Sequence, residues 1–95
     1  MIAVVATIRV KEDKQADFEA VMEELGEQVR ANEPGTTLYQ VCKSKQSPTY
    51  VVLENYTDQD AFNHHTTTSY FKAAGPKMGA CMDGAPKIEF FEVIG

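Results

Sequence analysis

The first ten positions of the chain, divided between two faces by alternation, form a mostly apolar segment that predicts a β-strand. Five apolar side chains fall on one face of this strand: Ile2, Val4, Ala6, Ile8 and Val10. The opposite face is also mostly apolar, with Val5 next to Thr7. A strand that is apolar on both faces is typical of a sheet that is covered on both sides.

The segment Lys14–Ala31 has the periodicity of an amphipathic helix. Its apolar stripe recurs every three or four residues: Phe18, Val21, Met22, Leu25 and Val29. Asp13 precedes the segment and is expected to cap its N-terminus. The helix should end at Asn32-Glu33-Pro34-Gly35, because proline cannot continue it and glycine permits a reversal of the chain.

Two strands should follow, Thr36–Lys43 and Thr49–Tyr56, because both segments are rich in threonine, tyrosine and valine. The five residues 44–48 between them are few enough for an antiparallel hairpin. Thr57 then opens a capping box with Asp60, which predicts a short helix to about His64.

The remainder of the chain predicts one more helix and one more strand. The helix runs from Thr68 or Ser69 to Met82, and the pair Gly75-Pro76 should bend or break it near the middle. After a turn, the segment Lys87–Ile94 forms the last strand.

The predicted order is β-α-β-β-α-β, which is the split βαβ arrangement of the α+β class. We expect a single domain over residues 1–95, with one antiparallel sheet and helices on one of its faces. Apolar residues occupy both faces of the predicted strands, so a monomer would expose a broad apolar surface to water. We therefore expect two copies to pack sheet to sheet as a symmetric homodimer.

The charge balance argues against a nucleic-acid partner. The chain holds nine Lys and Arg against fourteen Asp and Glu, a formal net charge of −5, and its basic residues never cluster. The longest apolar run, Met1–Ile8, is too short to span a membrane and lacks the basic start of a secretory signal. Cys42 and Cys81 fit neither a zinc spacing nor a disulfide framework, so we expect free thiols and a cytoplasmic location.

The most conspicuous polar cluster holds two adjacent histidines, His64 and His65. Neighbouring residues on a helix point about 100° apart, so the two rings cannot readily share an ion, and we predict no metal site. Asp60 lies one turn from His64 on the outer side, whereas Phe62 lies one turn from His65 on the inner side. His65 is then either an acid/base group that faces a cavity or a core-edge histidine bonded to a backbone carbonyl.

Three segments carry a family resemblance through their order and spacing. They are Glu33-Pro34-Gly35, Val52-Leu53-Glu54-Asn55-Tyr56, and Asp60-Ala61-Phe62 leading into His65-x-x-Thr68-x-Tyr70-Phe71. The chain resembles the antibiotic biosynthesis monooxygenase family over nearly its whole length, and the family's H-x-x-[ST]-x-[HY]-F signature selects His65 over His64. The resemblance implies a ferredoxin-like fold of the dimeric α/β barrel type, and oxygenation of quinols or phenols without a cofactor.

Two departures from the family pattern narrow the expected activity. The family often has tryptophan at the end of the third strand, where this chain has Tyr56. The haem-degrading branch resembles this chain less, because it has tryptophan at the position of His65 and histidine at that of Gly75. Haem degradation is therefore disfavoured.

We accordingly predict a small cofactor-independent monooxygenase with a quinol or phenol and dioxygen as substrates. A phenolate can itself give an electron to dioxygen, so the protein supplies an apolar pocket, a base and hydrogen-bond donors. The expected catalytic residues are His65, as the base, and Tyr56. The expected substrate-binding residues are Tyr39, Glu54, Phe71, Met78, Met82 and Phe90. Taken singly, each apolar member of this set also fits an ordinary core position.

Two other functions stay open. One is an isomerase or processing enzyme for a small phosphorylated signalling sugar, as in the family's quorum-signal branch, with Lys72, Lys77 and Lys87 attracting the phosphate. The other is a non-enzymatic dimeric module that binds a hydrophobic ligand.

Overall fold

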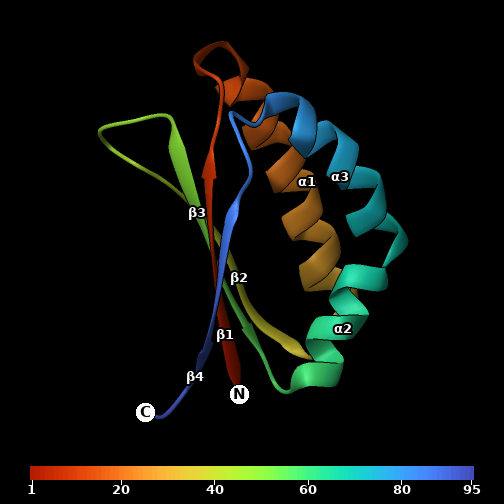
Figure 1. Ribbon diagram of the computed structural model, residues 1–95. Coiled ribbons are helices and arrows are strands. Elements are labelled where there is room, and N and C mark those ends of the chain that lie inside the picture. The colour runs from red at the N-terminus through yellow and green to blue at the C-terminus, as the bar shows by residue number, and fades with distance from the viewer.

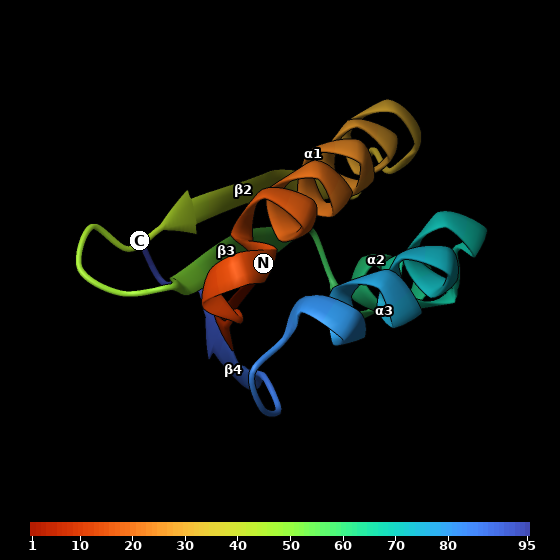
Figure 2. The ribbon, with the colours of Figure 1, turned by 90° about the horizontal axis from the view of Figure 1, so that it is seen from above.

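The fold is an α+β arrangement of one antiparallel sheet and three helices. A computed structural model describes residues 1–95 and has the elements β1 (Ile2–Arg9), a short 3₁₀ turn (Glu12–Lys14), α1 (Gln15–Asn32), β2 (Thr36–Lys43), β3 (Thr49–Tyr56), α2 (Gln59–Thr67), α3 (Ser69–Cys81) and β4 (Lys87–Glu92). The strand order in the sheet is β2-β3-β1-β4. All three helices lie on the same face of the sheet (Figures 1 and 2). The predicted split βαβ arrangement is confirmed.

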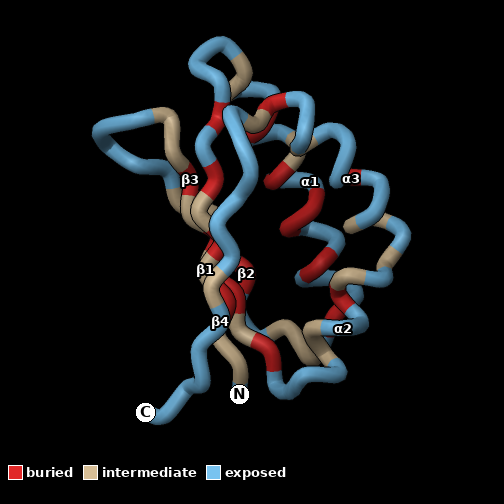
Figure 3. The backbone as a smooth tube through the Cα atoms, viewed as in Figure 1, coloured by how far each residue is buried: buried red, intermediate tan, exposed pale blue.

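The core lies between the sheet and the helices. Four members of the predicted α1 stripe are buried: Phe18, Met22, Leu25 and Val29. They face the strand side chains that alternation assigns to the inner face, such as Val4, Ala6 and Ile8 on β1. Figure 3 shows the buried segments of α1 and of the strands turned toward one another. Burial of these apolar side chains is the main force that holds the layers together.

The helix starts differ from the sequence predictions in their capping residues. Asp13 lies within the 3₁₀ turn, and the residue that precedes α1 is Lys14, which makes no side-chain cap. The N-cap of α2 is Asp58 and not Thr57, and its carboxylate accepts the Ala61 N–H at 2.8 Å. The Thr57 N–H donates to the Gly35 carbonyl at 2.9 Å, so it is not free for the reciprocal hydrogen bond to Asp60 that the predicted capping box needs.

Helix α3 and strand β4 also differ from the sequence predictions. The sequence predicts that the pair Gly75-Pro76 bends or breaks α3; the helix continues unbroken through Pro76, so a break there is wrong, and a bend stays a prediction. Proline has no backbone N–H, so the Lys72 carbonyl lacks its helical hydrogen-bond donor. Lys72 and Pro76 are both exposed, so water can donate to this carbonyl instead. Strand β4 ends at Glu92, short of the predicted Ile94, because Glu92 already pairs with Ile2 at the start of β1.

The second face of the sheet is covered by no helix. Cross-strand pairs such as Val5 with Leu53, and Ala3 with Phe91, place apolar side chains together on this open face. The Phe91 side chain is 50% exposed and Leu38 is 37% exposed. The chain alone therefore presents the apolar surface that the sequence predicts. None of the three helices is both long and apolar enough to cross a lipid bilayer.

Candidate active site

A cavity of about 450 Å³ lies between the sheet and the helices. Its size falls within the usual range of about 300–1,000 Å³ for small-molecule sites. Seven of the eight site residues predicted from the sequence line it: Tyr39, Glu54, His65, Phe71, Met78, Met82 and Phe90. The wall is otherwise mainly apolar, with side chains from β1, α1 and β4 such as Ile8, Met22 and Ile88. An apolar wall with few polar groups is suited to an aromatic ligand.

His65 is held by a buried carboxylate, that of Glu33. Its Nδ1 lies 3.0 Å from Oε1 and 3.1 Å from Oε2 of Glu33, and both side chains are 2% exposed. The predicted alternative, in which the ring is bonded to a backbone carbonyl, is wrong. The register prediction is confirmed, because His64 is exposed while His65 is buried and lines the cavity.

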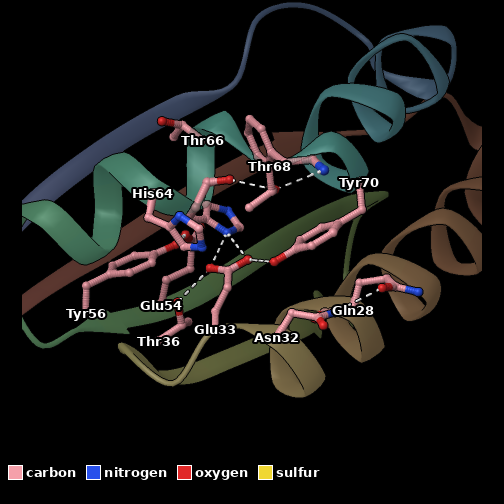
Figure 4. Close-up of polar contacts among 12 residues, drawn as sticks. Gln28, Asn32, Glu33, Thr36, Glu54, Tyr56, His64, Thr66, Thr68 and Tyr70 are labelled. Atoms are coloured by element: carbon pink, nitrogen blue, oxygen red, sulfur yellow. Dashed lines mark hydrogen bonds and ion pairs between the residues drawn. The ribbon is translucent and has the colours of Figure 1, made fainter.

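Glu33 also receives two hydroxyl donors (Figure 4). The Thr36 hydroxyl donates to Oε1 at 2.9 Å, and the Tyr70 hydroxyl donates to Oε2. Together with the His65 N–H, these donors satisfy a carboxylate that water does not reach. Burial and the hydrogen bond to Glu33 raise the pKa of Tyr70 to about 12, so its hydroxyl keeps its proton and remains a donor.

The end of α1 explains how Glu33 comes to face inward. Glu33 is the C-cap of α1, and its N–H donates to the Val29 carbonyl at 2.9 Å. The chain then turns at Pro34, and the Thr36 N–H returns to the Glu33 carbonyl at 3.1 Å. Sequence reasoning used Glu33 only as part of a helix end and of a family segment. Its isolated charge at a turn gave no sign that the side chain would be buried.

The position of the Glu33 carboxylate fixes the protonation of the His65 ring. A carboxylate accepts hydrogen bonds, so the imidazole proton lies on Nδ1 and the lone pair on Nε2. Nε2 has no hydrogen-bond partner in the protein. Every fully buried side-chain polar atom does have a partner, so Nε2 is not fully buried. It therefore faces open space at the cavity. Burial lowers the pKa of His65, and Glu33 only partly offsets this effect, so the ring is neutral at neutral pH and can accept a proton.

Aromatic rings and one hydroxyl hold His65 in place. The ring centroid of His65 lies 4.7 Å from Phe71, 5.4 Å from Tyr39 and 5.6 Å from Tyr56. The Thr68 hydroxyl donates to the His65 carbonyl at 2.9 Å and accepts the Phe71 N–H at 3.3 Å. Thr68 thus ties the end of α2 to the start of α3 at the residue that bears the imidazole.

A second carboxyl group, that of Glu54 on β3, reaches the cavity from the sheet. It accepts a hydrogen bond from the Tyr56 hydroxyl. Burial raises the pKa of Glu54 to about 7, the Tyr56 hydrogen bond opposes this rise, and the Glu33 charge adds to it. Tyr56 is fully buried and does not line the cavity, and its hydroxyl is bonded to Glu54. Its predicted catalytic role stays a prediction.

Tyr39 faces the same space from β2. Burial and the nearby charges of Glu54 and Glu33 raise the pKa of its hydroxyl well above the ordinary value. The group is therefore protonated throughout the physiological range and can act as a hydrogen-bond donor, as the sequence predicts.

The site has no cluster of side chains suited to bind a metal ion or a phosphate. No group of three or more His, Cys, Asp or Glu side chains is arranged to hold a metal. Lys72, Lys77 and Lys87 are exposed, and none of them lines the cavity. Cys42 and Cys81 are both free thiols, and neither lines the cavity.

Comparison with known proteins shows which family the chain and its fold belong to. The sequence model of the family described as antibiotic biosynthesis monooxygenase matches residues 1–77. A candidate antibiotic biosynthesis monooxygenase from Caulobacter crescentus is 48% identical, with a TM-score of 0.96 over 99% of this chain and 90% of that chain. Another from Nitrosomonas europaea is 22% identical, with a TM-score of 0.93 over 100% of both chains. No curated protein matches the chain. The chain belongs to the antibiotic biosynthesis monooxygenase family.

Proposed function

We propose that the protein is a cofactor-independent monooxygenase that oxidises a phenol or quinol with dioxygen in the His65 cavity. Family membership supports a small monooxygenase-like function. The observation that carries the finer assignment is the arrangement of His65. Its Nδ1 is bound to a buried carboxylate, and its unpartnered Nε2 belongs to a residue on the wall of an apolar cavity.

The first step is removal of the substrate's hydroxyl proton by Nε2 of His65. The resulting imidazolium is stabilised by the Glu33 carboxylate, just as a carboxylate orients and supports a catalytic histidine in other enzymes. The phenolate is electron-rich enough to pass one electron to dioxygen, which makes the substrate its own reductant. The phenoxyl radical and superoxide then combine at a ring carbon, and one oxygen atom stays on the ring while the other leaves as water.

The apolar wall of the cavity supports this chemistry because it offers few polar groups that would hold water beside the charged intermediates. The Phe71 ring packs at a tilt against the imidazole, and Met78 and Phe90 add further apolar side chains to the wall. An apolar site strengthens the hydrogen bonds that stabilise a phenolate, and the Tyr39 hydroxyl on the cavity wall can donate one. The phosphorylated-sugar alternative has no comparable support, since no lysine or arginine lines the cavity.

Oxygen consumption tests the proposal directly. We expect the purified protein, in the presence of a metal chelator, to accelerate oxygen uptake and to convert α-naphthol to naphthoquinone, or a small hydroquinone to the corresponding hydroxyquinone. A sugar phosphate should produce no uptake and should not compete with the phenol. Tight binding of phenols without any uptake above the spontaneous rate would contradict the monooxygenase and favour the hydrophobic-ligand module.

We also propose that the active form is a homodimer joined through the open face of the sheet. The exposed apolar side chains on this face, such as Leu38 and Phe91, need a cover in water, and a second copy offers a matching surface. Sedimentation at micromolar concentration should give twice the 10.5 kDa chain mass, and Leu53→Glu should yield a monomer because it places a charge in the interface. The exposed-helix variant Lys72→Glu should remain dimeric. A monomeric wild-type protein would refute this assembly.

A further inference from the structure

The proposed reaction handles two substrate protons, and His65 accounts for only one. Phenol and dioxygen become quinone and water, so the hydroxyl proton and the proton of the oxygenated ring carbon both end on one oxygen atom. Nε2 of His65 can hold a single proton, because Nδ1 keeps its own proton for Glu33. A second group on the cavity wall must therefore take the proton from carbon.

Glu54 is the wall residue that meets this need. One of its oxygens, Oε1, accepts the Tyr56 hydroxyl, and the other has no hydrogen-bond partner in the protein. Since no fully buried side-chain polar atom lacks a partner, the second oxygen borders open space, and the cavity is the space that Glu54 lines. Tyr39 cannot replace it, because burial and two nearby carboxylates hold the Tyr39 proton in place.

We propose that Glu54 is a second catalytic residue, which removes the proton from the ring carbon that receives oxygen and delivers it to the departing oxygen. This assignment rests on the proposed function. The peroxide forms while His65 still holds the hydroxyl proton, and His65 passes this proton to the departing oxygen only as the O–O bond breaks. The Glu54 carboxylate then removes the ring proton, the C–H electron pair forms the new C=O bond, and the O–O bond breaks to release hydroxide. The protonated Glu54 completes water and returns to its starting state.

The surroundings of Glu54 suit a group that both takes and gives a proton near neutrality. The ionisable groups around it are Tyr56 on β3, Tyr39 on β2, Glu33 at the end of α1 and His65 on α2, and β1 contributes only the apolar Val4 opposite. Because the pKa of Glu54 is raised to about 7, its carboxylate is lost as the pH falls below this value. His65 has a lowered pKa and is still neutral there, so Glu54 should set the acidic limb of the pH–rate profile.

Two variants test the role of Glu54 with α-naphthol and with the same compound deuterated at its para carbon. In Glu54→Gln, which keeps the side-chain shape, we expect kcat to fall about 10²–10⁴-fold, the limb near pH 7 to vanish, and the deuterium isotope effect to exceed that of wild type. In the wild type the Tyr56 hydrogen bond lowers the pKa of Glu54. Tyr56→Phe removes this bond, so the acidic limb of the pH–rate profile should move to higher pH. Melting curves and naphthoquinone binding control for folding and for an intact cavity.

The outcomes separate this assignment from the proposed function. An active wild type with Glu54→Gln retaining its rate, its pH limb and its isotope effect would overturn the role of Glu54 alone. A limb that stays in place in Tyr56→Phe would do the same. Absence of oxygen uptake in the wild type would overturn the proposed function and, with it, this assignment.

Discussion

Replacing His65 with alanine is expected to lower kcat about 10²–10⁴-fold, which is the usual contribution of a positioned base. The imidazole is the neutral group on the cavity wall whose free nitrogen can take the phenolic proton, and Glu33 stabilises the charge that results. Because the cavity wall is mainly apolar, we expect the substrate to bind mainly through apolar contact, and the KM should then change much less than kcat. Oxygen uptake across a range of phenol concentrations separates the two parameters.

His64 provides the matched control for this substitution. It has the same side chain one position earlier on α2, but it is exposed and does not line the cavity. His64→Ala should therefore keep wild-type turnover. Both variants must first melt at temperatures near that of the wild type, because removal of the buried His65 ring also leaves a gap. A folded His65→Ala protein with wild-type kcat would leave His65 as a packing residue only.

Glu33→Gln is expected to lower turnover by up to about 10⁴-fold, as in enzymes where an amide replaces the carboxylate behind a histidine. An amide NH₂ donates to Nδ1, so the imidazole proton would move to Nε2 and the base would become a donor toward the cavity. The nitrogen NMR shifts of His65 report this tautomer directly. Tyr70→Phe removes one hydroxyl donor from Glu33 but leaves the histidine contact, so it should retain the wild-type tautomer.

Glu33→Ala should in addition destabilise the fold. It leaves the His65 N–H and the Thr36 and Tyr70 hydroxyls without their shared acceptor, and each buried donor left without a partner costs about 1–3 kcal/mol. Urea unfolding should show this loss, whereas Glu33→Gln should lose less because it keeps an acceptor oxygen. Equal stability of Glu33→Ala and wild type would mean that water replaces the carboxylate.

The parts of the structure that follow from periodicity could be predicted from the sequence. Strand alternation placed Val4, Ala6 and Ile8 inside, and helical register separated His65 from His64, because both depend on geometry local to one element. The same pattern assigned most cavity residues correctly, since inward-facing residues of facing layers border the same space.

The parts that depend on contacts between distant segments could not be predicted. Glu33 meets His65 across 32 positions of sequence, and a buried carboxylate becomes favourable only when its donors are known. The Thr57 cap failed for a similar reason, since its N–H is engaged by Gly35 on another segment. The sequence predicts a bend or a break at Pro76 because the local cost of proline in a helix is visible there, whereas the solvent exposure that lets the helix continue is not.

Oxidation of α-naphthol under dioxygen labelled with oxygen-18, followed by mass spectrometry of the quinone, tests the central claim most directly. If the His65 cavity carries out a monooxygenation, the wild-type protein should form naphthoquinone with one labelled oxygen atom, and the second labelled atom should appear in water. His65→Ala should form only the product of the spontaneous reaction. A quinone without the label, or equal yields from wild type and His65→Ala, would contradict oxygen transfer at this site.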